Sequence, residues 1–142
     1  LDDCFMYNEK SRENKNYCNI CKQLYDSIYT SKLYVSPNVL VIILNRGKGS
    51  IYNLKFYFNE NIDITKFVLQ REMPQIKYEL YGVITHIDQS LSNALFIASC
   101  KSPVDSKWYR YNDAKITPIN NIQNEVINFG IPYILFYQKI NH

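Results

Sequence analysis

Short runs of strand length, separated by turn residues, constrain the fold of this chain more than any other feature. Strands are expected over residues 27–35, 38–45, 51–58, 78–87, 95–100, 107–111 and 133–138. Short helices are expected over residues 2–10 and 122–129, the second with Asn120 or Asn121 as its N-cap and Gly130 at its end. Parallel strands need crossover helices, which are scarce here. The pattern therefore predicts an α+β fold with a mostly antiparallel sheet and a few short helices.

The run 38–45 differs from the other runs because its apolar residues follow one another without alternation. An uninterrupted apolar run is typical of a strand that is covered on both faces. Ser36 and Pro37 mark the turn before it. We therefore expect this strand to be buried on both faces. Elsewhere, the polar stretch 11–16 is expected to be a loop, and Pro132 is expected to precede the last strand.

Length, composition and charge set further bounds. The chain has 142 residues, of which 46% are hydrophobic and 20% are charged, as in an ordinary globular domain or part of one. The formal charge of +3 is too small to indicate nucleic acid, and the longest apolar run is too short to cross a bilayer. Neither nucleic acid nor a membrane is therefore an expected partner. Since the chain begins at Leu1 rather than methionine, we expect a fragment of a longer protein.

The 4 cysteines do not have the spacing of a secreted disulfide scaffold, which favours a reducing, intracellular setting in the cytoplasm or nucleus. Cys18 and Cys21 form a C-x-x-C knuckle, which supplies two of the four thiolates of a structural zinc site. A redox motif of the C-x-x-C type would have a βα context, which the sequence lacks. Basic residues near the knuckle are interleaved with acidic ones, so a solvated face is favoured over a nucleic-acid-binding zinc knuckle.

Five motifs follow one another along the chain, at residues 17–21, 37–46, 78–86, 108–118 and 132–138. Read in order, they resemble the second half of the ubiquitin-specific protease domain, a ubiquitin carboxyl-terminal hydrolase of peptidase family C19. The second motif resembles the family pattern P-x-V-L-x-I-x-L-x-R, the fourth W-Y-x-F-D-D, and the fifth A-Y-x-L-F-Y. Any one of them is weak, whereas their order and spacing together are specific to the family, and the resemblance covers nearly all of the chain.

The resemblance implies a papain-like cysteine protease half-domain, with a fingers-like knuckle and strand over about 14–35 and a palm-like sheet over 36–142. Enzymes of this family cleave the bond after the C-terminal glycine of ubiquitin, using a cysteine thiolate, a histidine base and an Asp or Asn that orients the histidine. The implied partners are ubiquitin or a ubiquitinated protein, and the N-terminal half of the same domain. No cofactor is required, although Cys18 and Cys21 are implied either as half of a structural zinc site whose second knuckle lies upstream or as relics of such a site.

The chain departs from the family at the catalytic histidine position. The family pattern G-G-H-Y-x-A-Y aligns with residues 93–99, in which Phe96 and Ala98 keep the register, so Leu95 replaces the histidine. Leucine has no lone pair and no titratable proton, and it cannot act as a general base. Asn112 matches the orienting position of the family, and on its residue type it is equally a turn residue.

The same alignment assigns residues to the groove that would hold the C-terminal tail of ubiquitin. Asn93 and Ala94 stand where the family has the glycines that admit the tail of ubiquitin, and their side chains are expected to narrow the channel. Phe96 and Tyr109 are assigned to the same groove.

The cysteine box of the family has no counterpart in the chain, and Cys4 and Cys100 are expected to be buried, inert thiols. His86 is expected to be structural, and His142 is terminal. We therefore expect a catalytically inactive domain that binds ubiquitin or acts as a scaffold. The alternative is part of an active thiol-dependent deubiquitinase whose cysteine box lies on an N-terminal segment outside this chain.

Overall fold

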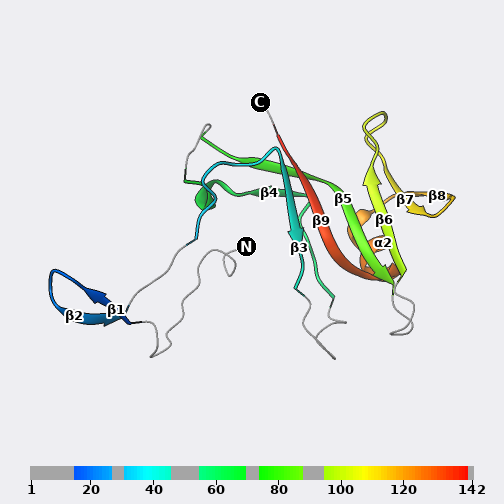
Figure 1. Ribbon diagram of the computed structural model, residues 1–142. Helices are drawn as coiled ribbons and strands as arrows, with labels where there is room; N and C mark the ends of the chain where they lie inside the picture. Colours follow the sequence, from blue (N-terminus) through cyan, green and yellow to red (C-terminus); the bar gives the residue numbers. More distant parts are fainter. Residues whose placement is uncertain (1–14, 27–30, 46–54, 70–73, 88–94, 141–142) are drawn as a thin grey trace.

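The strands in the described part of the chain form two antiparallel sheets (Figure 1). The computed structural model describes residues 15–26, 31–45, 55–69, 74–87 and 95–140. A small sheet pairs β1 (Lys15–Cys18) with β2 (Gln23–Asp26). The large sheet has the strand order β3-β9-β5-β6-β7-β8, with β4 paired to β5 off this path, which confirms the mostly antiparallel fold. Its strands are β3 (Val39–Ile43), β4 (Asn61–Asp63), β5 (Lys77–Ile87), β6 (Leu95–Lys101), β7 (Trp108–Asn112), β8 (Lys115–Ile119) and β9 (Ile131–Lys139).

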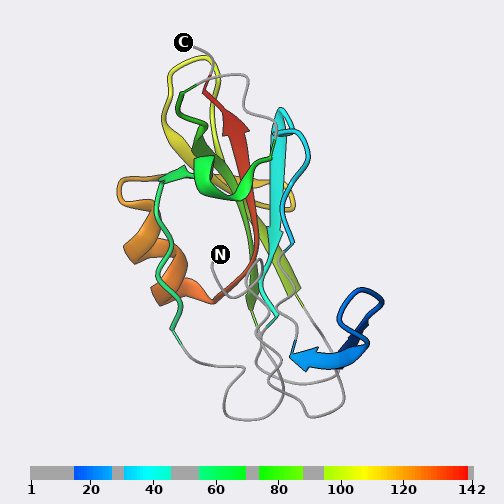
Figure 2. The ribbon, with the colours of Figure 1, turned by 90° about the vertical axis from the view of Figure 1, so that its left-hand side faces the viewer.

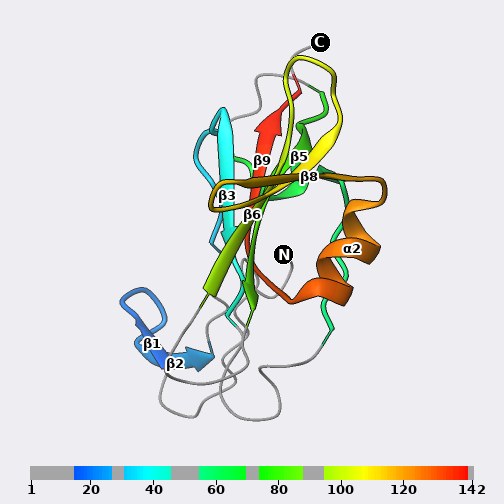
Figure 3. The same cartoon turned by 90° about the vertical axis from the view of Figure 1, so that its right-hand side faces the viewer.

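The main core joins the large sheet to α2 (Ile122–Phe129), which lies to one side of the sheet (Figures 2 and 3). The 3-10 helix η2 (Thr65–Phe67) contributes Phe67 to the same core. Burying one large apolar side chain stabilises a fold by about 1.5–3 kcal/mol. The buried core consists of Phe58, Ile64, Phe67, Val68, Ile76, Tyr78, Leu80, Val83, Trp108, Ile119, Ile122, Val126, Leu135 and Tyr137.

The helix α2 begins and ends where the sequence predicts. The side-chain oxygen of Asn121 accepts a hydrogen bond from the backbone N–H of Asn124 at 2.9 Å, so Asn121 is the N-cap. Gly130 is the C-cap, and its N–H donates to the carbonyl of Val126 at 3.0 Å. Ile122 and Val126 face the core one turn apart, and this packing stabilises a helix of 8 residues. No helix in the described part of the chain combines the length and apolar character needed to cross a membrane.

The strand β3 lies at an edge of the large sheet, so the expectation that it is buried on both faces is wrong within the described residues. Leu40 and Ile42 pack against the core. Val39, Val41 and Ile43 alternate with them and are 45%, 47% and 65% exposed. Among the described strands β3 pairs with β9 alone. A continuous apolar run is typical of a strand that is buried on both faces, but it does not show which part of which chain would cover each face.

Several other expectations fail in the first half of the chain. Residues 55–58 and 31–35 form no strand, apart from an isolated bridge between Leu33 and Val68. β1 begins at Lys15, inside the stretch that is expected to be a loop. The elements expected at residues 2–10, 27–30 and 51–54 lie outside the described residues.

Two strands carry little sequence signal of their own. β4 has only 3 residues, and β8 contains Pro118, which has no backbone N–H and is tolerated because β8 is an edge strand. Pro132 lies inside β9 instead of before it, where the register between β5 and β9 shifts after Ile84. An irregular pairing of this kind leaves room for a residue that cannot donate a ladder hydrogen bond.

Tyr137 joins the core of the sheet to the segment before β4. Its ring is buried, its hydroxyl donates to the carbonyl of Asn59 at 2.7 Å, and burial raises the pKa of the hydroxyl from 10.0 to about 12. Below pH 10 the Tyr137 hydroxyl keeps its proton in both the folded and the unfolded chain, so its contribution to the free energy of unfolding is fully present. Above pH 10 the hydroxyl ionises first in the unfolded chain, and this contribution is lost by about pH 12.

We therefore expect the free energy of unfolding to fall by about 2 kcal/mol more in wild type than in Tyr137→Phe as the pH rises from 10 to 12. Urea denaturation of both proteins at several pH values in this range measures the difference. Parallel pH profiles for the two proteins would contradict the assignment.

Candidate functional site

Leu95 and Asn112 come from adjacent strands and share one face of the sheet. Leu95, the first residue of β6, pairs with Ile87 of β5, and Ala98 further along β6 pairs with Tyr111 of β7. One more step in this register sets Asn112 opposite Ile97, which lies two residues after Leu95 on β6. Leu95 and Asn112 are therefore diagonal neighbours on one face of the sheet. Leu95 is 44% exposed and Asn112 is half-buried. The sheet thus brings together the two positions that the resemblance assigns to the histidine and its orienting residue.

Phe96 points to the opposite face, because neighbouring residues of a strand alternate. Its ring centre lies 4.8 Å from that of His86 and 5.7 Å from that of Tyr133, while 51% of Phe96 is exposed. His86 is buried in this aromatic cluster, away from the face of Leu95. It is not placed to act as a base beside the site, and His142 lies outside the described residues.

Asn112 also closes the hairpin between β7 and β8. It pairs with Lys115, and the intervening Asp113 has a φ of 50°, a conformation that Asp adopts more readily than most residues. The two readings of Asn112 are therefore compatible. The residue that ends the strand beside the site also starts the turn.

Tyr109 lies away from Leu95. It pairs with Cys100 near the other end of β6, and its hydroxyl donates to Asp105 Oδ2 at 2.7 Å. This hydrogen bond raises the pKa of Tyr109 and lowers the pKa of Asp105. The structure therefore separates Tyr109 from the candidate site, although it shares a sheet face with Phe96. The other two groove candidates, Asn93 and Ala94, lie outside the described residues.

Cys100 has the setting of an inert thiol. It lies within β6 and is half-buried, and burial raises the pKa of its thiol. A raised pKa disfavours the thiolate, which is the reactive form. Cys4 lies outside the described residues.

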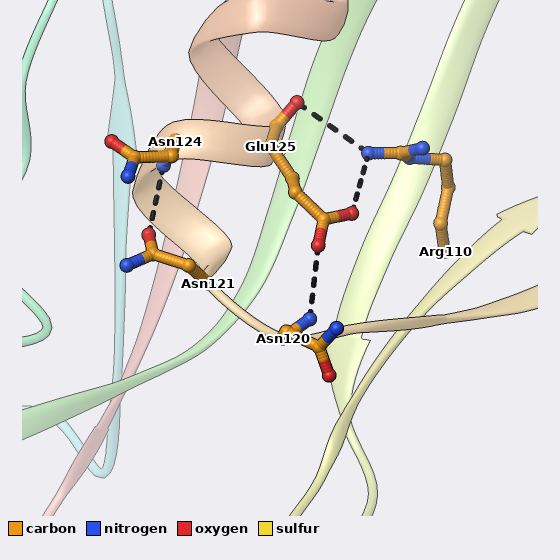
Figure 4. A network of polar contacts seen from close by, with 5 residues as sticks. All are labelled: Arg110, Asn120, Asn121, Asn124 and Glu125. Atoms are coloured by element: carbon orange, nitrogen blue, oxygen red, sulfur yellow. Dashed lines mark hydrogen bonds and ion pairs between the residues drawn. The ribbon is translucent and has the colours of Figure 1, made fainter.

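A polar network connects the middle of β7 to α2 (Figure 4). Arg110 Nη2 lies 3.5 Å from Glu125 Oε2 and donates to the Glu125 carbonyl at 3.4 Å. Glu125 Oε1 accepts from the N–H of Asn120 at 3.0 Å, and the Arg110 guanidinium carbon lies 3.9 Å from the centre of the Phe129 ring. This network is not evident from the sequence, although alternation with the buried Trp108 places Arg110 on the covered face, where a charge needs a partner.

Arg110→Ala is expected to lower the free energy of unfolding by about 2 kcal/mol, because Glu125 stays half-buried without its partner and Phe129 loses the guanidinium. Lys115→Ala, which removes an exposed cation from β8, is expected to change it by less than about 0.5 kcal/mol. Urea denaturation measures both values. Equal losses in the two variants would show that the network does not fasten β7 to α2.

The second candidate site is the knuckle between β1 and β2. The Sγ atoms of Cys18 and Cys21 lie 3.3 Å apart, and the Cys21 N–H donates to Cys18 Sγ at 3.5 Å. The Lys22 N–H donates to the Cys18 carbonyl at 2.7 Å, and Lys22 has a φ of 56°, so the turn is tightly closed. Hydrogen bonds from the Cys21 backbone and from its side chain lower the pKa of the Cys18 thiol and favour the thiolate.

These two sulfurs fit half of a structural zinc site. Tetrahedral Zn–S bonds of about 2.3 Å set S–S distances of about 3.8 Å, so widening the 3.3 Å gap by about half an ångström would admit the ion. Across the described residues, no group of three or more His, Cys, Asp and Glu side chains could hold a metal. The remaining ligands of a zinc at this knuckle would therefore come from outside the described part of the chain.

Comparison with known proteins decides the family. A family model of the ubiquitin carboxyl-terminal hydrolases matches residues 2–137. The chain belongs to this family. It is 30% identical over 146 residues to the mouse ubiquitin carboxyl-terminal hydrolase 17-like protein B, and 33% identical over 132 residues to ubiquitin carboxyl-terminal hydrolase 16 of Arabidopsis thaliana. These alignments cover 99% and 89% of this chain but 30% and 13% of the relatives, so the chain spans less than a third of their length.

Solved structures of ubiquitin hydrolases share the fold. The SAGA DUB module that contains Ubp8 and is bound to monoubiquitin matches with 25% identity and a TM-score of 0.78, covering 98% of this chain and 31% of that chain. A yeast SAGA DUB module with an Sgf73 mutant matches with 26% identity and a TM-score of 0.74, covering 98% of this chain and 32% of that chain. These likenesses confirm the expected papain-like, ubiquitin-specific protease fold.

Proposed function

We propose that this chain is part of a catalytically inactive ubiquitin-specific-protease-like domain that binds ubiquitin or serves as a scaffold. The observation that carries the proposal is Leu95, which shares a sheet face with Asn112 where the family has its histidine base. Leucine can neither take nor return a proton at any pH. The loss of one member of a catalytic triad typically costs about 10⁴ or more in rate.

Neither His86 nor Cys100 is placed to replace the missing base. His86 is buried against Phe96 on the other face of the sheet. Cys100 is half-buried within β6 with a raised pKa. An inactive site therefore agrees with the whole described neighbourhood of Leu95, beyond the one substitution.

Ubiquitin is the proposed partner because the surface that binds it does not need the catalytic residues. A module with the same fold has been solved bound to monoubiquitin. In this proposal the ubiquitin tail passes the exposed start of β6, where Leu95 and Phe96 are successive residues that point to opposite faces, and the half-exposed Phe96 ring is its apolar anchor. Asn93 and Ala94 narrow the path where the family has glycines.

The N-terminal half of the same domain is the second proposed partner. Val39, Val41 and Ile43 form an apolar row along the exposed side of β3. Burying a fully exposed side chain of this kind contributes about 1.5–3 kcal/mol, and because these three are already about half-buried, covering them would contribute roughly half of that for each. The chain spans 30% of the mouse relative, and the part of the domain that such relatives carry beyond it is the proposed cover.

For the knuckle we propose a structural zinc in the intact protein, held by Cys18, Cys21 and a second pair of thiolates outside the described residues. Zinc, when bound, would supply a crosslink and no catalytic chemistry. The support is the Sγ separation of 3.3 Å and the lowered pKa of Cys18. No other cofactor is proposed, and the proposed setting is the cytoplasm or nucleus, where thiols stay reduced.

Titrating isotopically labelled ubiquitin with this protein tests the main proposal. We expect ubiquitin amide resonances to shift at concentrations up to about millimolar, and Phe96→Ala to weaken the affinity about ten-fold. Val104→Ala is the matched control, because Val104 is 94% exposed in the loop at the other end of β6, and it should leave Kd unchanged. An unperturbed spectrum at millimolar ubiquitin would remove ubiquitin binding from the proposal.

A further inference from the structure

The knuckle between β1 and β2 holds two free thiols close enough to react with each other. Cys21 is exposed and Cys18 is half-buried, and their Sγ atoms lie 3.3 Å apart. A disulfide bond is about 2.05 Å long, so the sulfurs need to approach by about 1.3 Å. Rotation of the two side chains can supply a movement of this size without displacing the strands.

The turn keeps the backbones of the two cysteines close together. The Lys22 N–H donates to the Cys18 carbonyl at 2.7 Å and closes a five-residue turn, in which Cys18 is the first residue and Cys21 the fourth. One helical turn of this kind brings Cα atoms three residues apart to about 5–6 Å, which lies within the range of about 4.4–6.8 Å between Cα atoms of bonded cysteines. The positive φ of Lys22 leads the chain directly into β2, so the flanking strands hold this spacing.

We propose that Cys18 and Cys21 form a reversible intrachain disulfide, with a small-molecule disulfide such as oxidised glutathione as the oxidant. The Cys21 thiolate, which is the more exposed, attacks one sulfur of oxidised glutathione and releases one glutathione thiolate. The Cys18 thiolate then attacks Cys21 Sγ in the mixed disulfide and releases the second glutathione. The two cysteines together lose two protons and two electrons, and the oxidised glutathione takes up both pairs.

This disulfide and a bound zinc exclude each other, because both use the same two sulfur atoms. The knuckle thereby becomes a modification site that responds when the glutathione pool is oxidised. It is distinct from a thioredoxin-type oxidoreductase motif, since Cys18 and Cys21 join two antiparallel strands and do not precede a helix. The four cross-strand pairs between Lys15–Cys18 and Gln23–Asp26 are compatible with either state of the thiols.

Mass spectrometry of the metal-free wild-type protein tests the proposal without any substitution. Trypsin cleaves after Lys15 and Lys22, and the resulting peptide, residues 16–22, contains Cys18 and Cys21 but neither of the other cysteines. After incubation with oxidised glutathione and quenching in acid, we expect this peptide to have lost the mass of two hydrogens. We also expect its alkylation by iodoacetamide to be at least ten-fold slower than before oxidation, and reduced glutathione to restore it.

Cys21→Ser is the matched control, because it removes the second sulfur and leaves the turn sequence otherwise unchanged. Its peptide is expected to carry one glutathione on Cys18 instead of losing two hydrogens. A wild-type peptide that carries glutathione on one or both cysteines, or that keeps two alkylatable thiols, would overturn the proposal. Such a result would show that the turn cannot bring the sulfurs into bonding distance.

Discussion

Gly130→Ala is expected to lower the free energy of unfolding by about 3 kcal/mol. A Cβ atom at Gly130 would lie 2.7 Å from the His86 carbonyl oxygen and 2.7 Å from Thr85 Cγ2. Both distances are shorter than ordinary Cβ contacts, and the carbonyl belongs to the backbone of β5, which cannot turn aside as a long side chain can. The junction between α2 and β9 must therefore shift. This shift also disturbs the packing of α2 against the large sheet.

Gly82→Ala is the control for this prediction. A Cβ atom at Gly82 would meet Phe136 Cβ at 3.4 Å, an ordinary van der Waals contact, so we expect a loss of less than about 1 kcal/mol. Urea denaturation of the two variants beside wild type measures both changes. Similar losses at the two glycines would contradict the close approach of Gly130 to β5.

Leu95→His is expected to produce the largest change in activity. In a full-length protein whose cysteine nucleophile faces this site, it should raise hydrolysis of the bond after the C-terminal glycine of ubiquitin by at least about 10³-fold. The physical reason is that Asn112 is a diagonal neighbour on the same face and can orient the introduced imidazole. Leu95 is 44% exposed, so the substitution should leave the fold intact.

Leu95→Gln tests whether a polar side chain that cannot transfer a proton is enough to raise the rate. Glutamine is polar and of similar size but does not titrate, so this variant is expected to stay at the wild-type background. A fluorogenic ubiquitin substrate measures the rates of all three proteins. A wild-type rate within a few-fold of that of Leu95→His would mean that another group already serves as the base.

The elements around the candidate site could be predicted because their signals lie within their own residues. β5 and β6 are long runs with apolar side chains, and Asn121 and Gly130 mark the two ends of α2. β3 could be predicted as a strand but not as an exposed edge, since an apolar run does not reveal which chain covers its second face. β8 is not predicted from the sequence because Pro118 argues against a strand unless the edge position is known.

The site itself could be predicted only in part. The motif at residues 93–99 assigns Leu95 to the histidine position, and the structure places Leu95 diagonally to Asn112, as the resemblance requires. Tyr109 is assigned to the groove but lies away from Leu95, because a motif does not say how far along a neighbouring strand a residue lies. The pairing of Arg110 with Glu125 joins residues 15 apart in the sequence, and no local pattern encodes such a contact.

Exposure of the full-length protein to ubiquitin that carries an electrophile at its C-terminus tests the inactive site most directly. Such a reagent bonds to a cysteine only when that thiol is activated beside the tail groove. Because Leu95 cannot accept the proton of a nucleophile, we predict reversible ubiquitin binding and no covalent adduct. An adduct on a cysteine of the wild-type protein, abolished by competing unmodified ubiquitin, would contradict the account.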